Sequence, residues 1–139
     1  MNVGQIMSSR LVTVELDDKL EVVKEIFDTM QFHHVLVIED GKLFGVVSDR
    51  DLLKAISPFI GSTTETFRDL ATLNKRVHQV MSRKPITLHP EADLSAAVAL
   101  FLGQRISCIP IVDDDFRPIG LVSWRDVLRC HLGQPSAAP

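Results

Sequence analysis

The apolar positions of the first half of the chain predict short strands around an amphipathic helix. Apolar runs at residues 11–14, 35–38 and 43–47 have the length and composition of β-strands. Between the first two runs, apolar side chains recur at the spacing of one helix face, at Leu20, Val23, Ile26, Phe27 and Met30. Between the last two runs, Asp40-Gly41 is a strong signal for a two-residue hairpin turn. The predicted order is strand, helix, strand, strand.

The second half of the chain repeats this order. Short apolar runs at residues 86–88, 109–112 and 119–123 predict three strands. A helix is predicted after the first run, with an apolar face formed by Leu94, Ala97, Val98 and Phe101. Pro90 suits the first turn of that helix, where a missing N–H loses no hydrogen bond. The run DDDFRP predicts a longer loop between the last two strands.

The two halves are also similar residue by residue. VGQIM at 3–7 returns as VHQVM at 77–81, which is 74 residues later. After one inserted residue in the predicted turn, GVVSDRD at 45–51 returns as GLVSWRD at 120–126, which is 75 residues later. A further helix is predicted to close each copy, so the repeated unit is β-α-β-β-α.

The repeat defines the predicted domain organisation. We expect a first repeat at 1–57, a helical connector at 58–76, a second repeat at 77–132 and a disordered tail at 133–139. Thr63 or Thr64 is the predicted N-cap of the connector helix. Because about 55 residues can barely bury a core alone, the repeats are expected to pack as one globule with pseudo-two-fold symmetry. The predicted fold class is mixed α/β, of the α+β kind.

Composition and charge narrow the classes of partner. Of 139 residues, 45% are hydrophobic and 24% are charged, and the net charge is −3. These values are ordinary for a soluble protein, and basic residues are too dispersed to favour nucleic-acid binding. No apolar run approaches the roughly 20 residues of a membrane span, and no secretory signal is visible. Two cysteines fit a reducing compartment, so a cytoplasmic location without a membrane partner is expected.

The repeated Ser-x-x-Asp stretch has two interpretations. Ser48 with Asp51, like Ser123 with Asp126, has the spacing of a capping box, in which each side chain binds the other residue's backbone N–H. The same groups suit a ribose phosphate, because a carboxylate accepts from vicinal hydroxyls while a helix N-terminus and a Ser hydroxyl favour phosphate.

Neighbouring residues in both copies favour the ligand interpretation. Gly45 and Gly120 permit close approach to the backbone within a strand. Arg50 and Arg125 add a cationic group beside each Asp. A capping box requires neither the Gly nor the Arg.

Metal binding and catalysis find little support. His33 and His34 are adjacent on a predicted strand, so their side chains point to opposite faces and chelate poorly. The acidic run at 113–115 lacks the alternating oxygen ligands and the closing Glu of a calcium loop. No nucleophile elbow, Walker loop or His-Glu-x-x-His motif occurs. We predict no catalytic residue and no metal site.

Both copies resemble the regulatory repeat of the cystathionine β-synthase type, the CBS domain. The likeness covers about residues 3–57 and 77–132, so the whole chain resembles a tandem CBS pair. The family's nucleotide signature, Gly-hydrophobic-x-Ser/Thr-x-x-Asp/Asn, is matched by GVVSDRD at 45–51 and by GLVSWRD at 120–126.

The resemblance implies that adenosine-containing ligands bind in clefts between the repeats. Asp51 and Asp126 correspond to residues that hold the ribose hydroxyls. Ser48 and Ser123 correspond to residues that approach the phosphate. Residues implied to contact the sugar and base or to wall the adenine are Thr13, Thr87, Val35, Ile109 and Pro110.

One position departs from the family pattern. The family often has Pro where the first copy has Leu36, and Pro110 matches that preference in the second copy. Trp124, in place of Asp49, is expected either to cover the second site or to contact a partner. Nucleotide binding is therefore expected more strongly at the second motif than at the first. A single bound nucleotide per chain is compatible with the sequence.

The expected function is a stand-alone regulatory module, not an enzyme. It would bind AMP, ADP or ATP and signal through a change of conformation or oligomeric state, and whether Mg2+ accompanies the phosphate stays open. The resemblance implies a homodimer, and an unidentified effector protein is expected as a further partner. Two alternatives remain: a dimerisation or docking scaffold with vestigial sites, and a sensor of S-adenosylmethionine or NAD.

Overall fold

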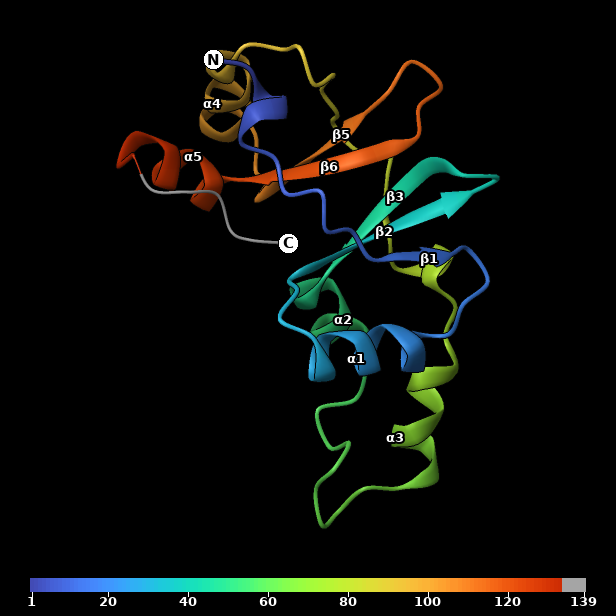
Figure 1. Ribbon diagram of the computed structural model, residues 1–139. Helices are drawn as coiled ribbons and strands as arrows, with labels where there is room; N and C mark the ends of the chain where they lie inside the picture. Colours follow the sequence, from blue (N-terminus) through green and yellow to red (C-terminus); the bar gives the residue numbers. More distant parts are fainter. Residues whose placement is uncertain (134–139) are drawn as a thin grey trace. The chain divides into compact units, whose positions relative to one another are not determined.

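The computed structural model describes residues 1–133, and these form two compact units (Figure 1). The β1–β4 unit comprises residues 12–39 and 44–84. The β5–β6 unit comprises residues 1–11 and 40–43 together with the described chain from Pro85 on. Of the tail predicted at 133–139, residues 134–139 lie outside the described residues. Each unit has its own hydrophobic core.

The β1–β4 unit contains a four-stranded sheet in the order β1-β2-β3-β4. Its strands are β1 (Thr13–Glu15), β2 (His34–Glu39), β3 (Lys42–Ser48) and β4 (Ser82–Arg83). β1 runs parallel to β2 and β4 runs antiparallel to β3. Its helical segments are α1 (Leu20–Thr29), α2 (Asp49–Ala55), α3 (Phe67–Ala71), η2 (Thr72–Asn74) and η3 (Val77–Gln79).

The turn between β2 and β3 confirms the predicted hairpin. Asp40 has a φ of 52° and Gly41 a φ of 78°, so both central residues are in the left-handed region. A type I′ turn requires this conformation at both positions, and Asp-Gly adopts it at low cost. β2 and β3 are consequently neighbours that run in opposite directions.

The two faces of this sheet differ in character. Val35, Val37 and Val47 are wholly buried and pack in one cluster with Leu20 and Val23 of α1. Because side chains alternate along a strand, the residues between these positions point to the other face. That face carries Thr13, Leu36 and Ser48.

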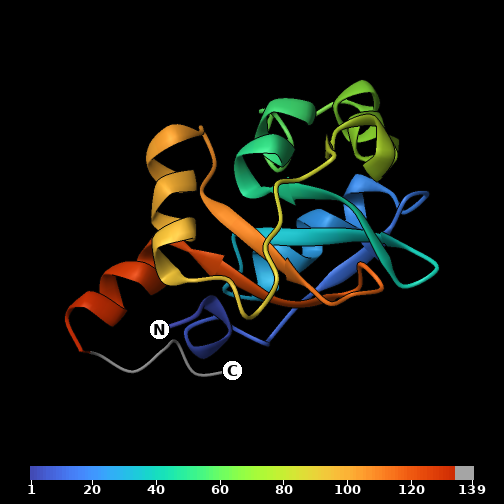
Figure 2. The same cartoon turned by 90° about the horizontal axis from the view of Figure 1, so that it is seen from above.

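The β5–β6 unit is built on an antiparallel pair of strands. It contains η1 (Val3–Gln5), α4 (Leu94–Gly103), β5 (Cys108–Val112), β6 (Pro118–Ser123) and α5 (Trp124–His131). Figure 2 shows α4 and α5 beside the β5–β6 hairpin. Buried Ala97 of α4 packs with Ile109, Ile111 and Val122 of the strands. Val3, from the start of the chain, is wholly buried in the same core.

Each unit combines the strands of one repeat with the leading segment of the other. The N–H of Val3 donates to the carbonyl of Ala92 at 2.9 Å. The repeat-equivalent N–H of Val77 donates to the carbonyl of Asp18 at 2.8 Å. The boundaries of the compact units in space therefore differ from those of the sequence repeats.

A methionine of each leading segment packs against the motif glycine. A Cβ added to Gly45 would lie 2.7 Å from Sδ of Met81 and 2.8 Å from the carbonyl oxygen of Ser82. A Cβ added to Gly120 would overlap Sδ of Met7. The space left by the missing side chain of each glycine is thus filled by a methionine of the leading segment.

Several sequence predictions need correction. Residues 86–88 form no strand: Leu88 makes only an isolated parallel bridge to Ile111. Pro90 does not lie in the first turn of a helix, because α4 begins at Leu94 with Asp93 as its N-cap. The connector helix is capped by Thr66, not by Thr63 or Thr64.

The remaining predicted elements are present within a residue or two of their expected ends. The mixed α+β class is confirmed, with strands and helices in the repeated order except at residues 86–88. Local pattern places these elements correctly because each buries one apolar face.

Replacing Gly45 with Ala is expected to destabilise the fold by about 1–3 kcal/mol, because overpacking displaces Met81 and the Ser82 backbone. Gly103→Ala is the matched control, since nothing lies within 4 Å of the added Cβ at the end of α4. The control should be neutral or more stable by up to about 1 kcal/mol. Urea denaturation measures both variants, and equal stability of Gly45→Ala and wild type would contradict this packing.

Candidate functional site

Both Ser-x-x-Asp motifs are capping boxes where a strand passes directly into a helix. The hydroxyl oxygen of Ser48 accepts from the N–H of Asp51 at 3.0 Å, and Oδ2 of Asp51 accepts from the N–H of Ser48 at 2.9 Å. The corresponding distances for Ser123 and Asp126 are 3.3 and 2.8 Å. The capping interpretation of these residues is confirmed.

Capping uses only one oxygen of each carboxylate. Oδ1 of Asp51 accepts no hydrogen bond from any residue in 1–133. Oδ1 of Asp126 lies 3.4 Å from Nη1 of Arg129, and Asp126 is only 7% exposed. Lys54 occupies the repeat-equivalent position of Arg129. The two acids therefore share a capping role but differ in the environment of the second oxygen.

Thr13 and Thr87 are predicted to contact the ligand as well. Thr13 lies on the sheet face that carries Ser48, and Thr87 is its repeat equivalent in the other unit. Thr13 is exposed on β1 and stands opposite Leu36 in the register. Thr87 is half-buried and precedes Leu88, whose N–H donates to the carbonyl of Pro110 at 3.2 Å. Each unit thus places a Thr beside the strand that carries Leu36 or Pro110.

Val35 and Ile109 occupy a different environment from the other predicted residues. Both side chains are 0% exposed and belong to the hydrophobic cores. Packing in the core explains these side chains, so a ligand at the opposite face of the sheet would meet only their backbone.

Arg50 and Arg125 are exposed in the first turns of α2 and α5. The guanidinium of Arg125 lies 5.6 Å from the ring centroid of Trp124, which is a cation–π distance. The glycines of the motifs serve close packing of Met7 and Met81, so the approach they permit is by protein side chains.

Two histidines adjoin the first motif. The N–H of Asp49 donates to the carbonyl of His33 at 2.9 Å, and Nδ1 of His33 lies 3.0 Å from Oδ2 of Asp49. Burial lowers the pKa of His34 below its usual value, although the charges of Asp49 and Asp51 act in the opposite direction. Burial would raise the pKa of Asp49, but the hydrogen bond with His33 and the Arg50 N–H bring it below its usual value.

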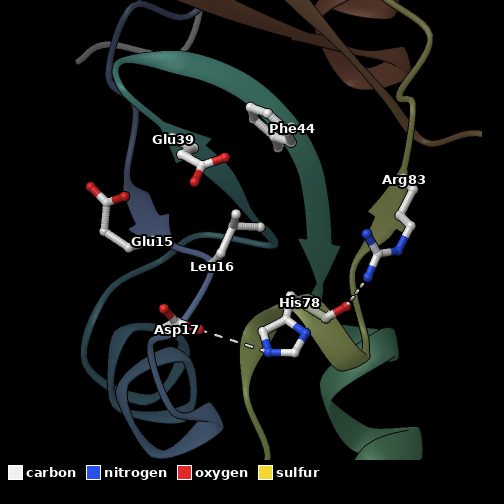
Figure 3. A pocket seen from close by; sticks show the side chains of 7 residues that line it. All are labelled: Glu15, Leu16, Asp17, Glu39, Phe44, His78 and Arg83. Carbon is white, nitrogen blue, oxygen red and sulfur yellow. Dashed lines mark hydrogen bonds and ion pairs between the residues drawn. The ribbon is translucent and has the colours of Figure 1, made fainter.

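A shallow hollow lies at the other end of the same sheet (Figure 3). Its volume is about 350 Å³, and its lining residues are Glu15, Leu16, Asp17, Glu39, Phe44, His78 and Arg83. Figure 3 shows Glu15 and Glu39 on one side of the hollow and Arg83 on the opposite side. The hollow adjoins the hairpin end of β2 and β3, whereas Ser48 adjoins the opposite end. Its residues come from segments far apart in the sequence, so no local pattern predicts it.

Neither a metal cluster nor a membrane span occurs in the described part of the chain. Within residues 1–133, no group of three or more His, Cys, Asp or Glu side chains is arranged to hold a metal ion. None of the helices described here combines the length and the apolar character that crossing a bilayer requires.

Comparison with known proteins identifies the family. The sequence profile of the CBS domain matches residues 3–58 and again residues 77–133. The chain belongs to the CBS domain family. Its two matches correspond to the repeats seen in the sequence, so the chain is a tandem CBS pair.

Three similar proteins illustrate the range of the family. A CBS domain-containing protein from Dictyostelium discoideum is 32% identical over 91% of this chain and 88% of its own length. The crystal structure of CBSX2 in complex with AMP has a TM-score of 0.78 and 27% identity, covering 95% of this chain and 96% of that one. The CBS pair of protein MJ0100, in complex with 5′-methylthioadenosine and S-adenosyl-L-methionine, has a TM-score of 0.78 and 25% identity, covering 96% and 97%.

The CBS pair also occurs within longer proteins. Several curated relatives with enzyme names are matched over only 22–23% of their length. The part they share with this chain is the CBS pair, and their activities belong to proteins several times longer.

Removing either capping hydroxyl should destabilise the protein. Ser48→Ala and Ser123→Ala are each expected to lower the free energy of unfolding by about 0.5–2 kcal/mol, because a backbone N–H at the start of a helix loses its acceptor. Ser9→Ala, at an exposed position outside the helices, is the control and should change little. Urea denaturation measures the free energy of unfolding of all three variants. The assignment would be contradicted if Ser48→Ala and Ser123→Ala lowered it no more than Ser9→Ala does.

Proposed function

We propose that this CBS pair is a non-catalytic regulatory module that binds an adenine nucleotide, AMP, ADP or ATP, through its two Ser-x-x-Asp motifs. The observation that carries the proposal is the carboxylate oxygen left beside each cap, most clearly Oδ1 of Asp51. A ribose presents two neighbouring hydroxyl donors, and a carboxylate oxygen is a strong acceptor for them. The AMP complex of CBSX2 supports an adenosine-containing ligand.

The polar groups around each motif suit the rest of the nucleotide. The Ser48 hydroxyl accepts from Asp51 but donates to no group within residues 1–133, so its proton is available to a phosphate oxygen. Arg50 and Arg125 supply exposed positive charge within the next turn. Thr13 and Thr87 adjoin the strands that would face the sugar and base.

The two motifs are expected to differ in affinity. Pro110 follows the family preference and Leu36 departs from it, which favours the second motif. Asp126, however, already lies within 3.4 Å of Arg129, whereas Asp51 has no such neighbour among the described residues. Binding of one nucleotide per chain is therefore as compatible with this proposal as binding of two.

The module would act by a change in its own assembly or in its contact with an effector protein. A ligand shifts such an equilibrium only by the difference between its affinities for the two states. We place the module in the cytoplasm, in keeping with its low cysteine content. Mg2+ would bind only together with the polyphosphate of ADP or ATP.

S-adenosylmethionine is the alternative ligand that an observation favours. A CBS pair of 25% identity binds this compound and 5′-methylthioadenosine. Both ligands contain a ribose, so the Asp residues would serve either one. A thermal-shift panel of AMP, ADP, ATP, NAD and S-adenosylmethionine separates the candidates, because a ligand at a hundred times its Kd stabilises the fold by about 2.7 kcal/mol.

Asp126→Ala is expected to weaken nucleotide binding at the second motif at least tenfold, as calorimetry would record. The expected loss of at least about 1.5 kcal/mol is that of a hydrogen bond to a charged group. Asp51→Ala tests the first motif in the same way. Asp69→Ala is a matched control, because Asp69 occupies the same position of a capping box with Thr66 in the connector.

The control separates helix capping from ligand binding. All three variants should lose stability, but Asp69→Ala should keep the wild-type affinity for AMP. Wild-type affinity in Asp51→Ala and Asp126→Ala as well would show that these acids only cap helices, and the scaffold alternative would then stand.

The helices that end the two repeats, α2 and α5, supply the surface proposed for a homodimer. Trp124, Leu128 and Leu132 recur every fourth residue along α5 and its C-cap, and each is at least 47% exposed. Leu53 of α2, the repeat equivalent of Leu128, is 72% exposed. Apolar side chains on matching faces favour self-association.

Leu128→Glu and Leu53→Glu are expected to lower the molar mass measured by light scattering from that of a dimer toward that of a monomer. Leu102→Glu is the control, because Leu102 is 84% exposed on α4, outside the closing helices. A monomeric wild type, or a dimer unaffected by the first two changes, would contradict the proposed interface.

A further inference from the structure

His34 lies beside the Ser of the first motif. It is the first residue of β2, and its neighbour Val35 points into the core, so the His34 side chain lies on the same face as Ser48. In the other unit, the register places Cys108 directly opposite Ser123. Cys108 and Ser123 are the repeat equivalents of His34 and Ser48. Because β2 and β3 are neighbours as well, the repeat implies that His34 is paired with Ser48.

Directly opposed residues of adjacent strands have Cβ atoms about 5 Å apart. A phosphate held by the Ser48 hydroxyl would therefore lie within a few ångströms of the His34 imidazole. Among residues 1–133, the charged and titratable groups that act on His34 are Asp49, Asp51 and His33. Two acids and one more histidine thus surround the position, and Asp49 is itself bonded to His33 at 3.0 Å.

We propose that His34 makes ligand binding at the first motif dependent on pH, by taking up a proton when an anionic ligand binds. This inference rests on the proposed function and adds the regulation of one of its sites. The second motif has Cys108 at the equivalent position and so lacks an imidazole that could gain positive charge. The two motifs of one chain would then respond differently to acidification.

The direction of the effect follows from the protonation equilibrium. Burial lowers the pKa of His34 below its ordinary value, so burial favours the neutral imidazole in the ligand-free protein. A bound phosphate stabilises the protonated form and raises that pKa. Affinity for the anion therefore increases as the pH falls toward and through the pKa of the bound state, about tenfold for each unit by which the ligand raises it.

The experiment measures AMP affinity at pH 7.5 and 5.5 by calorimetry in an Asp126→Ala background, which leaves the first motif as the site observed. His34→Gln removes the titrating group while keeping a polar side chain, and His33→Gln is the matched control on the adjacent residue. The AMP phosphate itself titrates near pH 6, but it does so identically with every variant. The comparison between variants therefore isolates the protein's contribution.

The expected result is a gain in affinity on acidification that is about tenfold larger in the chain with His34 than in the His34→Gln variant, and that is retained in His33→Gln. An NMR titration of the His34 imidazole, with and without AMP, tests the same point without substitution and should show a higher pKa in the complex. An equal gain in all variants, or an unchanged imidazole pKa, would overturn the inference while nucleotide binding stands. Absence of AMP binding at both pH values in the wild-type chain would overturn the proposed function together with it.

Discussion

The proposed function depends on one constraint, which is that a single carboxylate both caps a helix and keeps one oxygen for a ligand. In each repeat, a strand ends at a Ser and a helix begins at the next residue, so unsatisfied backbone N–H groups arise at this junction. One oxygen of the Asp and the Ser hydroxyl satisfy two of them. The hydrogen bonds hold the second oxygen in a fixed position, and a fixed acceptor binds a diol without the cost of ordering a side chain.

The exchange of leading segments connects these motifs to the rest of the chain. Met81, from the start of the second repeat, packs on Gly45 of the first motif, and Met7 packs on Gly120 of the second. The Gly, Ser and Asp of one signature consequently have separate physical roles. The Gly accommodates a methionine and the Ser caps a helix. The Asp caps the same helix and, in the proposed function, offers its second oxygen to a ligand.

Local sequence is sufficient to predict most elements because each buries an apolar face against its own unit. The hairpin at Asp40-Gly41 and the caps at Ser48 and Ser123 depend on neighbouring residues only, and their prediction is confirmed. The strand predicted around Leu88 is wrong, since the single bridge of this segment depends on Ile111, a residue distant in sequence.

Long-range contacts explain the other differences between expectation and structure. Periodicity gives no signal that residues 1–11 pack with the second repeat, and it does not distinguish a glycine facing a ligand from one facing Met7 or Met81. His34 stands out little in the sequence, because a histidine beside a strand is common. The role proposed for it follows from the pairing with Ser48 that the repeat implies.

A crystal structure determined with AMP at saturating concentration tests the central claim most directly. The account predicts ribose hydroxyls within hydrogen-bond distance of Oδ1 of Asp51 or Asp126, with Oδ2 still on the backbone N–H of Ser48 or Ser123. AMP bound elsewhere, or both carboxylates contacting only their own helix starts at full saturation, would contradict it.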